Sequence, residues 1–276
     1  RLGALFMFSK RDTFEIQVDI SFTKSVDLKV AIDKVTILRN LLAFFSDYYL
    51  PLEIITFVDE LSHRIDDEPS NVCTLLMNYK EDIDVVKRPF LISTKEIKDN
   101  FGDIWNNWSE FYTSTKYIAD LFYEIICNRS TRINRFLNLT QALEIYSSYY
   151  RDDQARNLAK ENGFSNTPFK FRIEDIFRAL NSIFKLDSIK LRKLSVNISN
   201  MRHFFTHNNR HKYTEPSIHQ IFAATRVLRF ALLALVYKTI GISDSIIENC
   251  MKRNEYKYLY QDIDPEFRKS GIALVG

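Results

Sequence analysis

The chain has 276 residues, of which 46% are hydrophobic, and it carries a formal net charge of +3. A chain of this length can bury one large core or two smaller ones, and its mild basicity is compatible with a polyanionic partner without being evidence for one. Its six glycines stand at positions 3, 102, 163, 241, 271 and 276. None of the GxGxxG, Walker A or GxSxG motifs occurs, so the sequence lacks the signatures of dinucleotide-binding proteins, P-loop NTPases and α/β-hydrolases.

The cysteines and the apolar segments set further limits. Cys73, Cys127 and Cys250 are far apart, which argues against a disulfide framework or a cysteine zinc site and favours a reducing, cytoplasmic compartment. The longest uninterrupted apolar run, residues 230–237, is too short for a membrane span, so we expect no membrane association. The first residues read as the middle of a strand, and we therefore expect the chain to begin inside a longer protein.

The first part of the chain, residues 1–94, predicts a mixture of strands and helix. Residues 14–22 alternate apolar and polar side chains, as a half-buried strand does. Residues 25–46 place apolar side chains three and four positions apart, which predicts an amphipathic helix. Residues 51–58 are rich in β-branched side chains and begin with a proline, as an edge strand can. Weaker strand candidates are residues 72–77 and 90–92.

From residue 95 onward the sequence predicts helices only. The apolar spacing of three and four residues recurs, and a polar, proline-containing loop is expected at 165–169. The predicted helices span residues 97–111, 112–127, 134–150, 173–184, 188–206, 216–240 and 243–253. The expected fold is therefore α+β, with a mixed N-terminal region at 1–94, an all-α helical bundle at 95–253 and a tail at 254–276.

The segment that best indicates a catalytic function is residues 199–212, which contains three of the five histidines. Arg202 and His207 stand in an R-x4-H arrangement near the predicted end of an amphipathic helix. Asn208 and Asn209 follow, and asparagine commonly ends helices. If the helix frays near Phe205, His207 can turn back toward Arg202. If the helix continues regularly, the two side chains point about 140° apart.

Two segments resemble a known family. Arg202, His203 and His207 match the motif of HEPN ribonucleases, in which an arginine is followed by a polar residue and then a histidine. Residues 135–144, RFLNLTQALE, resemble the first bundle helix of ApeA-like HEPN proteins, which are bacterial anti-phage, abortive-infection proteins. The resemblance covers roughly residues 110–253, and the strand–helix–strand organisation before it is similar to the region that precedes HEPN in that family.

The resemblance implies an endoribonuclease that needs no metal or other cofactor and forms a homodimer through the bundle, with the motifs of two protomers in one cleft. The ribose 2′-OH would attack the phosphate and leave a 2′,3′-cyclic phosphate. His207 would act as general base or acid, because histidine titrates near neutral pH. Arg202 would bind the scissile phosphate through its permanently charged guanidinium. His203 would orient the site or the partner's motif.

Other residues near the motif have plausible supporting roles. Glu144 could hold Arg202 or a histidine in place, or it could be an ordinary surface carboxylate. Lys193, Arg210 and Lys212 surround the motif helix and make the local field positive, as an RNA-binding surface requires. The expected partners are RNA, with transfer RNA as one candidate, a second copy of the chain, and a phage trigger or regulatory protein.

Several alternatives remain open at this point. The chain could be a catalytically silent helical module for dimerisation and RNA binding, or the toxin of a toxin–antitoxin pair. His207 could simply favour the helix dipole, and Arg202 could be a surface ion-pair residue. The row His203, His207 and His211 could suggest a metal site, but the asparagines between them should end the helix first, and we expect no metal.

Overall fold

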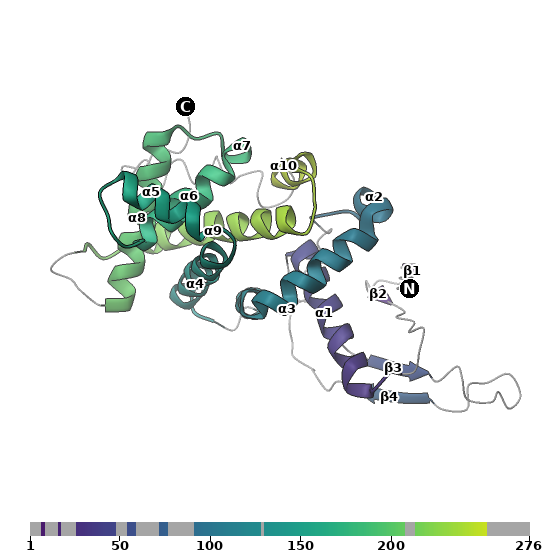
Figure 1. The fold of residues 1–276 in the computed structure, drawn as a ribbon. Coiled ribbons are helices and arrows are strands. Elements are labelled where there is room, and N and C mark those ends of the chain that lie inside the picture. Colours follow the sequence, from purple (N-terminus) through teal and green to yellow (C-terminus); the bar gives the residue numbers. More distant parts are fainter. Residues whose placement is uncertain are drawn as a thin grey trace, which may run out of the picture. The chain divides into compact units, whose positions relative to one another are not determined.

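The structure is a computed structural model that divides into two compact units, Arg1–Pro89 and Phe90–Gly276. It describes residues 7–8, 16–17, 26–47, 54–58, 72–76, 91–127, 130–207 and 213–252 (Figure 1). The domain limits predicted at 1–94, 95–253 and 254–276 stay predictions, and the tail at 254–276 lies outside the described residues.

The first unit contains one long helix, α1 (Leu28–Ser46). The helix begins where the Asp27 side chain accepts a hydrogen bond from the Lys29 N–H, which satisfies one of the unpaired amides of the first turn. It ends at Asp47, which adopts a left-handed conformation with φ of 57°. The helix predicted at 25–46 therefore exists, with a later start at Leu28 and the predicted end at Ser46.

Among the described residues of the same unit, four short strands form two antiparallel pairs. Strands β1 (Met7–Phe8) and β2 (Ile16–Gln17) pair over two residues each. Strands β3 (Ile54–Val58) and β4 (Val72–Leu76) pair over five, with Thr56 opposite Thr74. Most of the strand predicted at 14–22 lies outside the described residues.

The predicted α+β fold class is wrong. Of the residues whose side chains the structure places, 83% are helical and none lies in a strand, which supports an all-helical fold. The alternation of residues 14–22 and 51–58 reflects a local β preference, but isolated pairs of short strands do not build a sheet layer. At the predicted strand 90–92, Leu91 and Ile92 are buried in a bend that leads into the first helix of the second unit.

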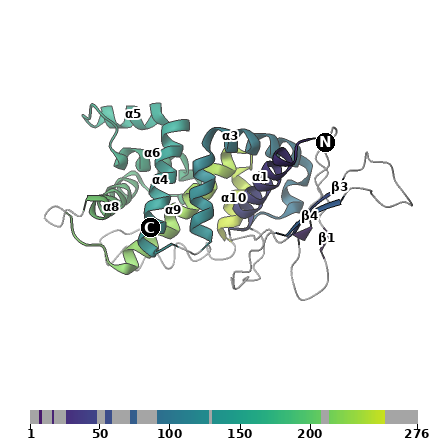
Figure 2. The ribbon, with the colours of Figure 1, turned by 90° about the horizontal axis from the view of Figure 1, so that it is seen from below.

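The second unit is a helical bundle, as the sequence predicts. Its helices α3 and α9 both pack against α4, and α6 packs against α5 and α8 (Figure 2). Its elements are α2 (Thr94–Ile97), the 3-10 helix η1 (Lys98–Asn100), α3 (Phe101–Ile126), α4 (Arg132–Tyr150), α5 (Asp152–Glu161), α6 (Phe169–Ala179), α7 (Asn181–Phe184), α8 (Ser188–His207), α9 (Ile218–Thr239) and α10 (Asp244–Lys252).

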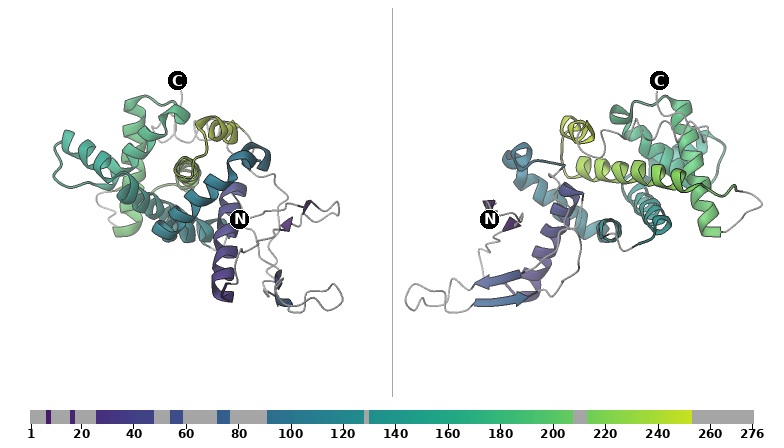
Figure 3. Two further views of the ribbon diagram at one scale, coloured as in Figure 1. Left: turned by 45° about the vertical axis from the view of Figure 1, so that its right-hand side comes forward. Right: turned by 180° about the vertical axis from the view of Figure 1, so that it is seen from behind.

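Helix α9 is the central element of this bundle and crosses it as one long rod (Figure 3). It begins with a capping box in which the Ser217 and Gln220 side chains each accept the other's backbone N–H. Its length and apolar composition would suit a membrane span, but 72% of its apolar stretch of 18 residues is buried within the protein. This burial is typical of a helix in the core of a bundle.

Helix α3 differs from the prediction because the two helices expected at 97–111 and 112–127 are merged across a kink. Thr115 has non-helical angles, φ −135° and ψ 39°. The hydroxyls of Thr113, Ser114 and Thr115 each donate to a carbonyl four residues earlier, at 2.8, 2.8 and 2.7 Å. Such hydrogen bonds compete with the helical ladder and often bend it.

The segment before α8 also differs from the prediction. Helix α5 was not predicted, and the helix expected at 173–184 begins earlier, at Phe169, and breaks at Leu180 into α6 and α7. Phe169 was expected in a loop, but the structure makes it the first residue of α6 and buries its ring. This difference bears directly on the site.

Candidate active site at the end of helix α8

Helix α8 carries the R-x4-H motif and is fixed at its start and along one face. The Asp187 carboxylate accepts the Lys190 N–H at 2.8 Å, and this backbone hydrogen bond lowers the pKa of Asp187. The side chains that anchor the helix in the bundle are Leu191, Leu194, Ile198 and Phe204. Met201 and Phe205 are only half-buried, because Phe204 turns inward instead.

The helix does not fray before the motif ends. Helix α8 runs through His207, so the five regular helical steps from Arg202 to His207 direct the two side chains about 140° apart. One copy of the chain therefore does not bring the two predicted catalytic residues to one point. Each has its own surroundings.

Arg202 is held by two other helices. Its Nη2 lies 2.5 Å from Oε2 of Glu144 on α4, and both side chains are partly exposed. Its guanidinium carbon lies 4.2 Å from the centroid of the Phe169 ring on α6. A cation over an aromatic face within about 6 Å is attracted by the ring. Arg202 thus has its charge paired on one edge and its planar face covered.

The histidines form a separate stack. The rings of His203 and His207 lie 5.7 Å apart at 26°, and those of His203 and Tyr213 lie 5.6 Å apart at 17°. His203 is half-buried between its two neighbours, and His207 is exposed. Within the described ranges, no hydrogen bond engages the His207 imidazole. His203 therefore lies between His207 and Tyr213, and its role in orienting the site or the partner's motif stays a prediction.

The predicted RNA-binding residues are placed only in part. Lys193 is exposed on α8, about 40° around the axis from His207 and about 21 Å along it. Arg210 and Lys212 lie outside the described residues, as does His211 of the histidine row. Among the residues that the structure describes, no group of three or more His, Cys, Asp or Glu side chains could hold a metal ion.

A basic cluster lies at the start of α4. The half-buried Arg135 has its pKa lowered first by burial and then by the charges of Arg229 and Arg132, so three guanidinium groups gather here. The Phe136 ring contacts the Phe205 ring, with centroids 6.2 Å apart. This contact joins the first turns of α4 to the last turns of α8 and brings the positive cluster to the motif's end of the bundle.

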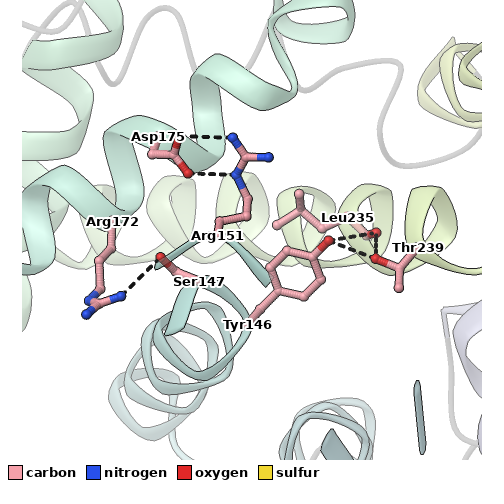
Figure 4. A network of polar contacts seen from close by, with 7 residues as sticks. All are labelled: Tyr146, Ser147, Arg151, Arg172, Asp175, Leu235 and Thr239. Atoms are coloured by element: carbon pink, nitrogen blue, oxygen red, sulfur yellow. Dashed lines mark hydrogen bonds and ion pairs between the residues drawn. The ribbon is translucent and has the colours of Figure 1, made fainter. Parts of the chain in front are cut away.

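A polar network fixes α4 relative to α6 and α9 (Figure 4). Arg151, which caps α4, binds both carboxylate oxygens of Asp175 on α6, at 2.6 and 3.0 Å. The Tyr146 hydroxyl lies 2.8 Å from that of Thr239 on α9. Because Glu144 is on α4 and Phe169 is on α6, this network also sets the distance between the two groups that hold Arg202.

One family model matches the part of the chain that contains this site. Residues 137–246 match the family model described as Apea-like HEPN, and the matched range contains Glu144, Arg202 and His207. No curated protein and no solved structure matches the chain. The match supports an ApeA-like HEPN domain at residues 137–246, in agreement with the resemblance seen in the sequence. Such a domain suggests a nuclease-type function in phage defence.

Proposed function

We propose that this ApeA-like HEPN domain is a metal-independent endoribonuclease of a bacterial anti-phage system, with Arg202 and His207 as its catalytic residues. The observation that carries the proposal is the position of Arg202, whose guanidinium is fixed by Glu144 and Phe169 near the end of the helix that exposes His207. A preorganised cation beside a group that titrates near neutral pH is what phosphodiester cleavage by the ribose 2′-OH requires.

Arg202 stabilises the transition state in this mechanism. A guanidinium has five N–H donors, and the Glu144 carboxylate engages Nη2, which leaves donors for a phosphate oxygen. The attack of the 2′-OH places additional negative charge on the non-bridging oxygens, and a charge-assisted, bidentate contact stabilises that charge. The products are a 2′,3′-cyclic phosphate and a 5′-OH.

His207 transfers the protons. As a neutral imidazole it accepts the proton of the 2′-OH, and as an imidazolium it donates a proton to the departing 5′ oxygen. The proton that His207 accepts from the 2′-OH is the one that it then donates to the departing oxygen, so one His207 serves each site. The divergence of Arg202 and His207 on one regular helix supports a site that is completed by a second copy of the chain.

The basic residues extend the proposal to substrate binding. Lys193 on the His207 face, the cluster of Arg132, Arg135 and Arg229, and Arg210 and Lys212 supply positive charge that attracts an RNA backbone. The proposed setting is the bacterial cytoplasm, where a phage trigger or regulatory partner activates the enzyme and RNA, with transfer RNA as one candidate, is cut.

One observation favours a second candidate. Glu144 already neutralises much of the charge of Arg202. The same ion pair is expected in a catalytically silent module that dimerises and binds RNA, since such a module needs no charge at a scissile phosphate. The two functions differ in a single assay, because a silent module binds RNA without cutting it.

The test uses purified full chain and total RNA in buffer that contains EDTA. We expect Arg202→Ala and His207→Ala to lower the cleavage rate by at least about 100-fold, within the range for loss of an acid–base or charge-stabilising group. Arg156→Ala, which removes a surface ion-paired arginine on α5, and His219→Ala, which removes an exposed histidine on α9, are the matched controls. RNA binding without cleavage by the wild type would favour the silent module.

A further inference from the structure

The aromatic face beneath Arg202 comes from a part of the chain with no motif. Phe169 is 5% exposed, and its ring centroid lies 4.2 Å from the guanidinium carbon of Arg202. Glu144 contacts the edge of the same guanidinium. An edge contact alone lets a planar cation rotate about the axis of the ion pair, whereas a ring against its face removes that freedom.

The Phe169 ring is itself anchored. It is the first residue of α6, directly after Pro168, whose carbonyl accepts the Phe171 N–H at 3.0 Å. Farther along α6, Asp175 binds Arg151 through two hydrogen bonds. The Phe171 ring packs edge-to-face on the Phe164 ring, with centroids 5.1 Å apart. The start of α6 is therefore held from both sides, and the ring is a fixed platform rather than a surface that follows Arg202.

We propose that Phe169 is a positioning residue for the reaction: its ring sets the plane of the Arg202 guanidinium, so that the edge away from Glu144 meets the scissile phosphate. The inference rests on the proposed ribonuclease function. Without the ring, Arg202 keeps its charge and its attraction for RNA but loses its fixed orientation. Misplacement of a charge-stabilising group lowers the rate of the chemical step more than it weakens binding.

The experiment compares substitutions at Phe169 in the full chain, with kcat and KM measured on one RNA substrate. Phe169→Leu keeps an apolar side chain but removes the aromatic face, and we expect kcat to fall by about 10- to 100-fold while KM stays within about twofold. Phe169→Tyr keeps the face and should retain kcat within about threefold.

A packing control separates positioning from general loss of stability. Phe177 is fully buried on the same helix and contacts Phe184 rather than Arg202. Phe177→Leu should lower the free energy of unfolding at least as much as Phe169→Leu does, yet leave kcat per folded molecule unchanged. In an Arg202→Lys background, which removes the planar guanidinium, Phe169→Leu should have little further effect on kcat.

The outcomes are distinguishable. If the wild type cleaves RNA and Phe169→Leu has the same kcat, or if Phe177→Leu loses as much kcat as Phe169→Leu, the inference about Phe169 is wrong and the ribonuclease function stands. If Phe169→Tyr is as impaired as Phe169→Leu, the aromatic face is not what matters, and the inference is also wrong. If the wild type does not cleave RNA, the proposed function fails and the inference falls with it.

Discussion

Arg202 and Glu144 are 58 positions apart in the sequence, yet their side chains meet at 2.5 Å between Nη2 and Oε2. The contact joins α8 to α4, the two helices that carry the segments resembling the HEPN family. Because both side chains are partly exposed, the ion pair adds little to stability, and its value lies in holding the guanidinium in place.

Removing the charge of Glu144 should therefore affect activity more than stability. Glu144→Gln keeps the shape of the side chain but weakens the hold on Arg202, and we expect kcat to fall by about tenfold while the free energy of unfolding changes by less than about 1 kcal/mol. Glu161→Gln, an exposed carboxylate on α5, is the matched control. A rise in cleavage on Glu144→Gln would instead show that Glu144 restrains Arg202 by competing with the phosphate.

The partly buried pair between Arg151 and Asp175 should matter for stability. Arg151→Met leaves the carboxylate of Asp175, which is 8% exposed at the side chain, without its partner. We expect a loss of about 3 kcal/mol in urea unfolding, because an unpaired buried charge is costly. Arg156→Met, which breaks an exposed pair with Asp152, should cost less than about 0.5 kcal/mol. Equal losses for the two variants would show that Asp175 is not sealed from water.

Tyr146 should make stability sensitive to alkaline pH. Burial raises the pKa of its phenol above the ordinary value of 10.0, and the hydrogen bond with Thr239 opposes this only in part. In the unfolded chain the phenol ionises near pH 10, whereas in the folded protein it ionises only at a higher pH. The stability due to this difference is present in full below pH 10 and is lost as the pH rises through the folded pKa.

Unfolding curves between pH 8 and pH 11 test this linkage. The free energy of unfolding of the wild type should fall more steeply above pH 10 than that of Tyr146→Phe, since the variant has no phenol at this position and shares every other tyrosine. Parallel curves would mean that water reaches Tyr146.

A shared site makes a specific prediction for mixed dimers. Arg202→Ala and His207→Ala chains with different tags can be co-expressed and the mixed dimer isolated. We expect the mixed dimer to cleave RNA at least about tenfold faster than either variant alone, because one intact arginine and one intact histidine then meet across the interface. No recovery would indicate that each site uses Arg202 and His207 of the same chain.

The sequence predicts the bundle better than the site. Apolar spacing placed α4 and α8 within one or two residues of their observed ends, because a helix that buries one face must repeat apolar residues along it. The same reasoning failed for α5, whose packed side is built only from Ala155, Leu158 and Ala159. It also gave the wrong fold class, since alternation in short segments does not ensure a sheet.

Within the site, the sequence pointed to Arg202, His207 and Glu144 through a family resemblance, but it did not predict Phe169. Phe169 follows a proline in a segment with loop composition, and only the packing of α6 against α8 brings its ring to Arg202. No local pattern encodes a contact between side chains 33 positions apart that depends on the angle at which two helices cross. For the same reason, the stack of Tyr213 on His203 was not predicted.

The most direct test of the central claim is the chemistry of the RNA ends. Purified full chain should be incubated with total RNA in EDTA, and the termini at each cleavage site mapped. The proposed mechanism predicts 2′,3′-cyclic phosphate and 5′-OH ends that are absent with His207→Ala. Ends with a 3′-OH and a 5′-phosphate, or cleavage that stops in EDTA, would contradict it.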